Sequence, residues 1–99
     1  MDPLLERGWP YNHVTGDEQV LDHQGVLHSV VVNGLTTAGD LTLYDSLTEA
    51  GLVIAVLHLD PTTSISVQPI AFVYDCKLTI GLYCGFDGTL AADITVMAQ

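Results

Sequence analysis

The four histidines are the residues of this chain best suited to bind a metal ion or to transfer a proton. His23 and His28 lie five positions apart across Gly25, whereas His13 and His58 stand alone in the sequence. Three histidines on neighbouring strands could form a zinc site, but none of these spacings supplies a recognised set of zinc ligands. Isolated histidines in strands are more often surface or hydrogen-bonded core residues, so we expect no metal site and no other cofactor.

Acidic residues stand in two places where they could also do chemistry. Asp40, Asp45 and Glu49 crowd one loop region and could bind Ca²⁺, although their spacing matches no known calcium loop and turn acids commonly accept backbone N–H bonds. Asp75 and Asp93 could form a glycosidase-like carboxylate pair if their strands are adjacent, but so small a domain has little room for the necessary cleft. No serine is flanked by the residues of a catalytic nucleophile. The sequence therefore predicts that the protein is not an enzyme.

The two cysteines are the remaining reactive side chains. If residues 76–84 form one strand, Cys76 and Cys84 point to the same face but lie about 26 Å apart at ~3.3 Å per residue. A disulfide needs Cα atoms closer than about 7 Å. Unless the chain folds back at Gly81, both cysteines are free thiols.

The composition indicates a single small domain that depends on other protein chains. The chain has 99 residues and a formal charge of -10, with 48 % apolar residues and only 14 % charged ones, whereas typical soluble domains have about 25 % charged residues. So few charges cannot cover the surface of a free monomer well. We therefore expect part of the uncharged surface to be buried against another chain.

Charge and hydropathy also exclude several partners. Arg7 and Lys77 are the two fixed cations, too few to neutralise a row of nucleic-acid phosphates or to bind an anionic membrane. The most apolar run, Leu52–Leu59, has eight residues, and a membrane-spanning helix needs about twenty. The first residues, MDPLLERGWPYNH, lack the apolar stretch of a signal peptide. We expect a protein that is made and kept in a cytoplasm until it assembles.

Secondary structure is expected to be β nearly throughout. Prolines and glycines break every period in residues 1–16, which predicts an extended N-terminal arm before a single domain over residues 17–99. Alternating apolar and polar residues predict the strands of that domain: 17–23, 26–32 (closed by Asn33-Gly34), 40–44, 52–59, 64–67, 70–74, 77–83 and 91–97. Residues 45–51 could form a short helix or a loop, and Asp87-Gly88 a turn. Leu52–Leu59 is apolar on both faces apart from His58, as in a strand covered on both sides.

Seven or eight short strands in about 100 residues favour an all-β fold, a sandwich or a small barrel. We predict a single antiparallel β-sandwich, jelly-roll-like, that follows the N-terminal arm.

Four motifs carry a resemblance to a known group of proteins. They are GVLH at 25–28, LYD at 43–45 followed by Gly51, YDCKLTIGL at 74–82 and GTLAADITV at 88–96. The pattern resembles that of small virion structural proteins of tailed bacteriophages and spans about three-quarters of the chain. Lys77-Leu78 departs from it at a place that commonly holds an aromatic residue. The resemblance implies a β-sandwich in the phage particle, best as a capsid decoration (cement) protein, and carries no active-site residues.

That role implies definite partners. A decoration protein on the capsid exterior binds the major capsid protein and copies of itself, most naturally as a homotrimer at a local three-fold position. In this interpretation the arm contacts the capsid, through apolar or aromatic side chains and one cation that pairs with a capsid carboxylate: Leu4, Leu5, Trp9, Tyr11 and Arg7. A disordered tail is the alternative for the arm. For the protein, the alternatives are a tail, neck or fibre-base position in the virion, or a small carbohydrate-binding module.

Overall fold

The computed structural model describes residues 10–60 and 69–99, and the described chain is all-β. Its elements are β1 (Tyr11–Val14), β2 (Glu18–Leu21), β3 (Gly25–Thr37), β4 (Gly39–Asp45), β5 (Leu52–Leu59), β6 (Ile70–Leu78), β7 (Leu82–Phe86) and β8 (Ala91–Ala98). The predicted strand over residues 64–67 lies outside the described residues.

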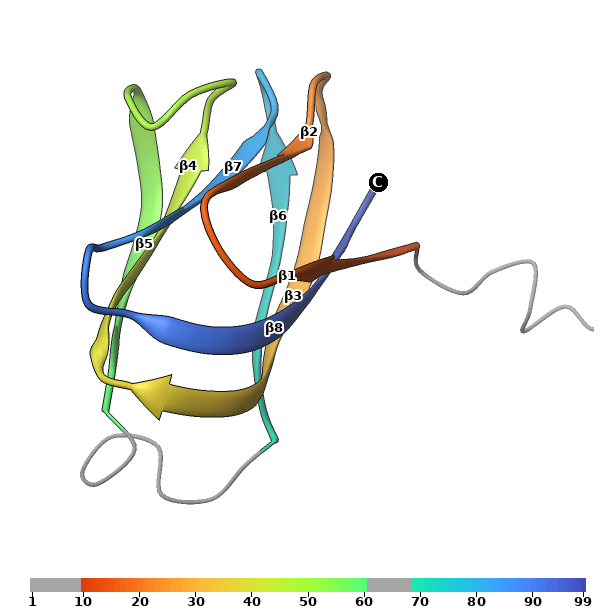
Figure 1. Ribbon diagram of the computed structural model, residues 1–99. Helices are drawn as coiled ribbons and strands as arrows, with labels where there is room; N and C mark the ends of the chain where they lie inside the picture. Colours follow the sequence, from red (N-terminus) through yellow and green to blue (C-terminus); the bar gives the residue numbers. More distant parts are fainter. Residues whose placement is uncertain (1–9, 61–68) are drawn as a thin grey trace, which may run out of the picture.

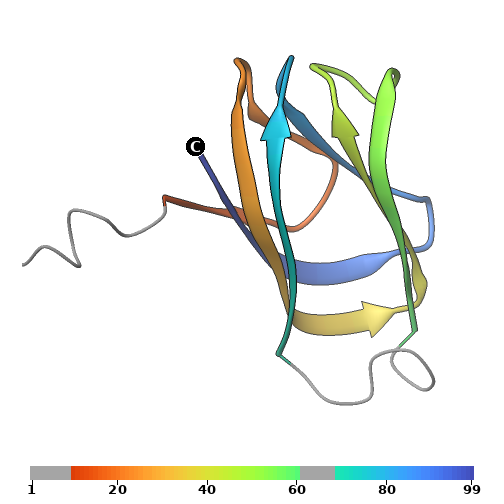
Figure 2. The ribbon, with the colours of Figure 1, turned by 180° about the vertical axis from the view of Figure 1, so that it is seen from behind.

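The strands form two four-stranded antiparallel sheets that pack face to face (Figures 1 and 2). Sheet A has the order β1-β8-β3-β6, and sheet B has the order β2-β7-β4-β5. Successive strands mostly alternate between the two sheets, and this order is that of an eight-stranded jelly roll. The predicted fold class is therefore confirmed.

The core lies between the sheets and is built mainly from leucine, valine and isoleucine. Side chains alternate along each strand, so every second residue of an inner strand faces the other sheet. In β4 these are Leu41 and Leu43, and in β8 they are Ile94 and Val96, all without solvent exposure. Burying such a side chain contributes about 1.5–3 kcal/mol relative to leaving it exposed.

The sandwich begins earlier than predicted. Tyr11–Val14 was expected to belong to the arm, but it forms β1, which pairs with β8 from Tyr11 opposite Met97 to Val14 opposite Ile94. Val14 is fully buried in the core. The predicted boundary at residue 16 is wrong for this segment, because backbone pairing and the burial of one valine hold it in sheet A.

Strand β3 is also longer than predicted. Asn33-Gly34 was expected to end the strand, but β3 continues through both residues to Thr37. The side-chain amide of Asn33 donates to Asp93 Oδ1 at 3.0 Å and to Thr95 Oγ1 at 2.9 Å, both on the neighbouring β8. Asn33 therefore links two neighbouring strands at a position where a turn was predicted.

Residues 77–83 do not form the single strand predicted. β6 ends at Leu78 in sheet A, and β7 begins at Leu82 in sheet B, so the chain folds back between them. Gly81 makes this turn possible, since a Cβ atom there would lie 2.6 Å from the backbone oxygen of Leu21. Cys76 and Cys84 consequently lie on different strands, and both are free thiols.

Residues 46–50 between β4 and β5 form a loop, which decides between the two predicted alternatives. The Ser46 hydroxyl donates to the Ala50 carbonyl at 2.6 Å and accepts the Thr48 N–H at 3.3 Å. Gly51 ends the loop with a φ of 134°, a conformation that residues with a side chain rarely adopt.

Strand β5 differs most from the prediction. Leu52–Leu59 was expected to be covered on both faces, but β5 is an edge strand of sheet B and pairs with β4 alone among the described strands. Its first two residues and Val56 are exposed. A continuous apolar run does not by itself distinguish a covered central strand from an edge strand. That difference depends on the order of the strands in the sheet, which one run of sequence does not reveal.

Candidate interaction surface

Of the five residues predicted to contact a partner, the structure describes Tyr11. Leu4, Leu5, Arg7 and Trp9 lie outside the described residues. Tyr11 stands at the start of β1, and its side chain is 74 % exposed. The structure thus places one aromatic side chain at the surface of an edge strand of sheet A.

Three histidines form ion pairs with aspartates on neighbouring strands. Each pair joins an edge strand to the strand beside it: His13 (β1) with Asp93 (β8), His28 (β3) with Asp75 (β6), and His58 (β5) with Asp40 (β4). The first and third pairs have N···O distances of 2.8 Å. The hydrogen bonds from His13 and Asn33 hold the pKa of Asp93 below its ordinary value. These histidines join neighbouring strands, and His13 and His58 are exposed, which agrees with the expectation of surface or hydrogen-bonded core histidines.

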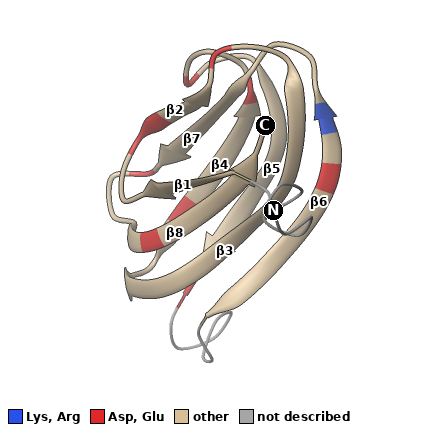
Figure 3. Cartoon of the chain, turned by 90° about the vertical axis from the view of Figure 1, so that its right-hand side faces the viewer, with Lys and Arg blue, Asp and Glu red and all other residues tan. Residues whose placement is uncertain are grey.

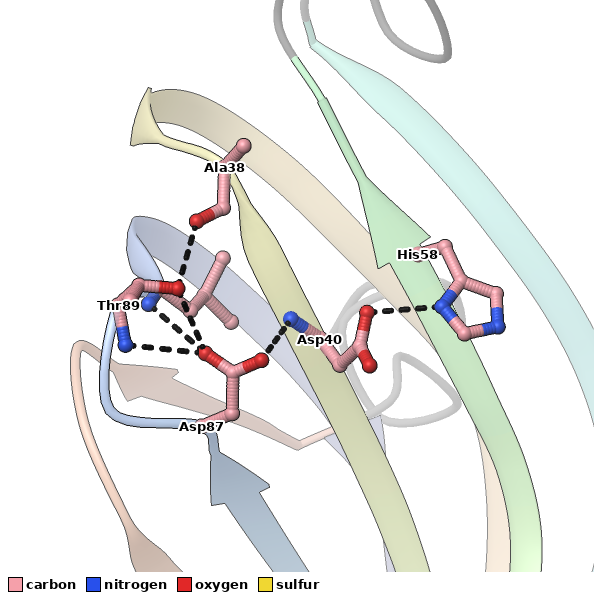
Figure 4. Close-up of polar contacts among 6 residues, drawn as sticks. Ala38, Asp40, His58, Asp87 and Thr89 are labelled. Carbon is pink, nitrogen blue, oxygen red and sulfur yellow. Dashed lines mark hydrogen bonds and ion pairs between the residues drawn. The ribbon is translucent and has the colours of Figure 1, made fainter.

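The pair of His58 and Asp40 belongs to a larger polar network at one end of sheet B (Figure 4). The Asp40 backbone N–H donates to Asp87 Oδ2 at 2.9 Å. Asp87 Oδ1 accepts the backbone N–H and the hydroxyl of Thr89, both at 3.0 Å, and that hydroxyl lies 3.1 Å from the Ala38 carbonyl, to which it can also donate. Asp87 therefore organises the turn between β7 and β8, as predicted for Asp87-Gly88, and the backbone N–H groups lower its pKa.

The polar groups of this network do not form a recognised catalytic constellation. An aspartate that holds a histidine also occurs in hydrolases, but catalysis there needs a nucleophile in line with the histidine, and the sequence lacks a nucleophile-elbow motif. Asp75 and Asp93 do not form the possible carboxylate pair, because their strands are not adjacent but lie on opposite sides of β3. No group of three or more histidine, cysteine or acidic residues among the described residues could hold a metal ion.

Asp45 is a buried carboxylate that accepts several hydrogen bonds from a single turn. It ends β4, is 8 % exposed, and accepts the backbone N–H groups of Thr79, Ile80 and Gly81 at 2.9, 2.9 and 3.3 Å. The Thr79 hydroxyl adds a bond of 2.8 Å. Burial alone would raise the pKa of Asp45, but these donors outweigh it and lower the pKa to about 2. Asp45 thus fixes the turn between β6 and β7, which is the structural role that its sequence context also allowed.

The exposed aliphatic side chains concentrate on β5 and the loops beside it. Leu52, Val53 and Val56 of β5 are 63 %, 54 % and 42 % exposed. Leu47, in the loop before β5, is also exposed, and so is Ile80, whose backbone is bonded to Asp45 at the same end of the sandwich. We call this set of five exposed residues, on β5 and in the loops near its first residues, the β5 surface. Such a surface is typical of a site that contacts another protein.

The sequence contained one signal of the β5 surface that the prediction did not use. Residues 46–59 contain one charged side chain, Glu49. An edge strand in a protein that stays monomeric usually carries a charge or a proline that blocks pairing with another chain. The eight residues of β5 include no proline, lysine, arginine or acidic residue, and its histidine, His58, is paired with Asp40.

The charges around this surface all have one sign. The strands of sheet B carry three acidic residues and no lysine or arginine: Glu18, Asp40 and Asp45. The described lysine, Lys77, belongs to β6 in sheet A, where Figure 3 shows the blue segment. Sheet B is consequently an anionic layer with an apolar edge.

In comparisons with known proteins, no protein family, curated protein or solved structure matches the chain. Within residues 10–60 and 69–99, no helix is long and apolar enough to cross a membrane. The fold and the β5 surface therefore define an acidic jelly-roll sandwich with an exposed apolar edge.

Proposed function

We propose that this protein is a structural protein of a tailed-bacteriophage virion that decorates the outside of the capsid and stabilises the shell by protein contacts. The observation that carries the contact role is the β5 surface, in which an edge strand without lysine, arginine or acidic residues exposes three aliphatic side chains by 42 % or more. The four sequence motifs support the virion assignment. Jelly rolls are also used in viral capsid domains, which supports it by analogy of fold.

The proposed partners follow from the decoration role that the sequence resemblance implies. The protein binds the major capsid protein and copies of itself, with a homotrimer at a local three-fold position as the simplest arrangement. Leu4, Leu5, Arg7, Trp9 and Tyr11 are the proposed contacts of the N-terminal segment. The net charge of -10 disfavours nucleic acid and anionic membranes as partners. The protein is made in the host cytoplasm and joins the capsid exterior.

A capsid protection assay tests this function. Heads of the encoding phage that lack the protein are heated with and without the purified protein, and release of DNA is measured. Bound protein is expected to raise the temperature of release, because ligand binding stabilises the bound state by mass action. A variant without residues 1–9 tests the N-terminal segment separately and leaves β1 intact. Heads that neither bind the protein nor gain stability contradict the proposal.

A tail, neck or fibre-base position keeps the same contact role within the virion. Immunogold labelling distinguishes it from decoration, since a decoration protein appears in many copies over the head and a tail or neck protein at one vertex.

A carbohydrate-binding role has one specific observation in its favour. Tyr44 and Tyr83 are cross-strand neighbours on β4 and β7, with ring centroids 6.3 Å apart in an edge-to-face arrangement. Both side chains are half-buried, and lectins also use jelly rolls. A glycan array with and without EDTA tests this role, and Tyr44→Ala would abolish any glycan signal that depends on the pair.

A further inference from the structure

Among the described strands, none pairs with the outer backbone edge of β5. β5 pairs with β4 on one side, and no described strand lies on its other side. An edge strand presents a row of backbone donors and acceptors that can add a strand from another chain. The register shift opposite Leu43 and Tyr44 bends β5 near Ile54 and leaves Ala55–Leu59 in regular pairing with β4.

The other edges of the sandwich are protected in ways that β5 is not. β1 and β2 are four residues long, which limits what can pair with them. β6 carries Lys77 and has Asp75 at a φ of 47°, where its pairing with β3 is irregular. β5 has eight residues without proline or a permanent charge. It is therefore the edge most open to an added strand.

The outer face of sheet B gives an added strand something to pack against. Val56 lies beside Thr42, and Val53 lies beside Tyr44, so two exposed valines continue the rows of half-buried side chains on β4. Side chains of an added strand would extend these rows by one position. Aliphatic or β-branched residues fit best, because such pairs are the favourable ones across neighbouring strands.

The charge of sheet B selects among the possible occupants. Antiparallel pairing of two β5 strands would bring the end of one near Glu49 toward the end of the other near Asp40, and each chain carries a net charge of -10. Like charges across such a contact repel. A segment with lysine or arginine at its ends would instead be attracted by Glu49, just before β5, and by Asp40, which lies opposite His58 near the end of β5.

We propose that β5 binds an extended segment of a different protein, which adds a fifth strand to sheet B and carries uncharged aliphatic residues in its middle and lysine or arginine at its ends. This mode of binding is β-augmentation, in which the backbone supplies affinity and the side chains supply specificity. The identity of the partner as a capsid protein rests on the proposed function, whereas the chemistry of the segment does not.

A head-binding experiment tests the surface. Purified heads are sedimented with the wild-type protein, with Val56→Lys and with Val73→Lys, a matched control because Val73 is 63 % exposed on the edge strand of the other sheet. Melting curves confirm that each variant folds. Val56→Lys is expected to weaken binding about tenfold or more, and Val73→Lys to bind like the wild type. Equal binding by all three overturns the inference and leaves the proposed function standing.

A second measurement tests the inference without phage heads. If the wild-type protein does not bind heads, that result overturns the proposed function alone, and this measurement still decides the inference. Hydrogen exchange is followed at residues 52–59 with a synthetic Val-Thr-Val-Thr-Val peptide that has two lysines at each end, and with the same peptide that has glutamates there. The lysine peptide is expected to protect β5, less so at high salt. Protection by neither peptide, or protection that grows with the concentration of the protein alone, overturns the inference, the latter in favour of a second copy.

Discussion

Replacement of Asp45 by asparagine is the sharpest test of how this sandwich is held together. The Asp45 carboxylate accepts three backbone N–H groups and one hydroxyl from the turn at residues 79–81. Asparagine keeps the shape of the side chain but replaces one acceptor oxygen with an NH₂ group, which would face N–H donors. Asp45→Asn should therefore loosen the connection between the two sheets without creating a cavity.

The magnitude follows from the pKa. A shift from 3.8 to about 2 corresponds to about 2 kcal/mol of stabilisation by the ionised carboxylate. A buried donor left without an acceptor costs about 1–3 kcal/mol, part of which the pKa shift already includes because these same donors cause it. We expect Asp45→Asn to lower the free energy of unfolding at pH 7 by about 2–4 kcal/mol. For a domain of this size the melting temperature should fall by roughly 10–20 °C.

The lowered pKa of Asp45 also determines how the effect of Asp45→Asn should vary with pH. Because the pKa of Asp45 is lower in the folded state than the ordinary 3.8, its stabilisation is present above about pH 5 and is lost as the pH falls toward 2. About half of this contribution should be gone at pH 3. The difference between wild type and variant should shrink accordingly.

Urea unfolding at several pH values measures this difference, with Asp22→Asn as a charge-matched control at an exposed position before β3. A variant within about 0.5 kcal/mol of wild type at pH 7 would refute the reasoning. So would a difference that stays constant from pH 7 to pH 3.

Three further predictions concern other parts of the fold. Gly39→Ala should lower the free energy of unfolding in urea by about 1–3 kcal/mol, because the new Cβ atom would lie 2.7 Å from the backbone of the β7–β8 turn. Gly34→Ala is the control and should be tolerated, because a Cβ atom there would have nothing within 4 Å. His13→Ala should raise the pKa of Asp93 toward its ordinary value in an NMR titration, since it removes the bond that lowers this pKa most; an unchanged titration would show that the pair does not persist in solution. Cys84 should resist alkylation until the protein unfolds, because burial raises its pKa to about 12; modification at the rate of a free thiol would contradict this.

The fold class was predictable from the sequence because strand-forming runs and turn residues are local signals. Alternating apolar and polar residues predicted the strands that are β4 and β8, and Asp87-Gly88 marked a true turn. Errors arose where a distant residue overrides a local signal. Asn33 continues β3 because its amide reaches β8, and residues 79–81 turn because Asp45, more than thirty positions earlier, binds their N–H groups.

The predicted contact with another chain stays a prediction. Low charge in the sequence indicated contact with another chain. Of the five residues predicted to make it, the structure describes Tyr11, which lies in β1, and the other four lie outside the described part. The β5 surface depends on strand order, which is set by pairing between segments distant in sequence. The partners of the histidines were unpredictable for the same reason: His13 and Asp93 meet only because the first and last strands are neighbours.

The position of β8 has a consequence for how the protein forms during translation. β8 lies between β1 and β3, so sheet A cannot assemble until the ribosome has made Ala91–Ala98. Before that moment the nascent chain exposes the leucines and valines that β8 later covers, and such chains are prone to aggregate. A cell that makes many copies at once would keep more of them soluble at low growth temperature or with abundant chaperones.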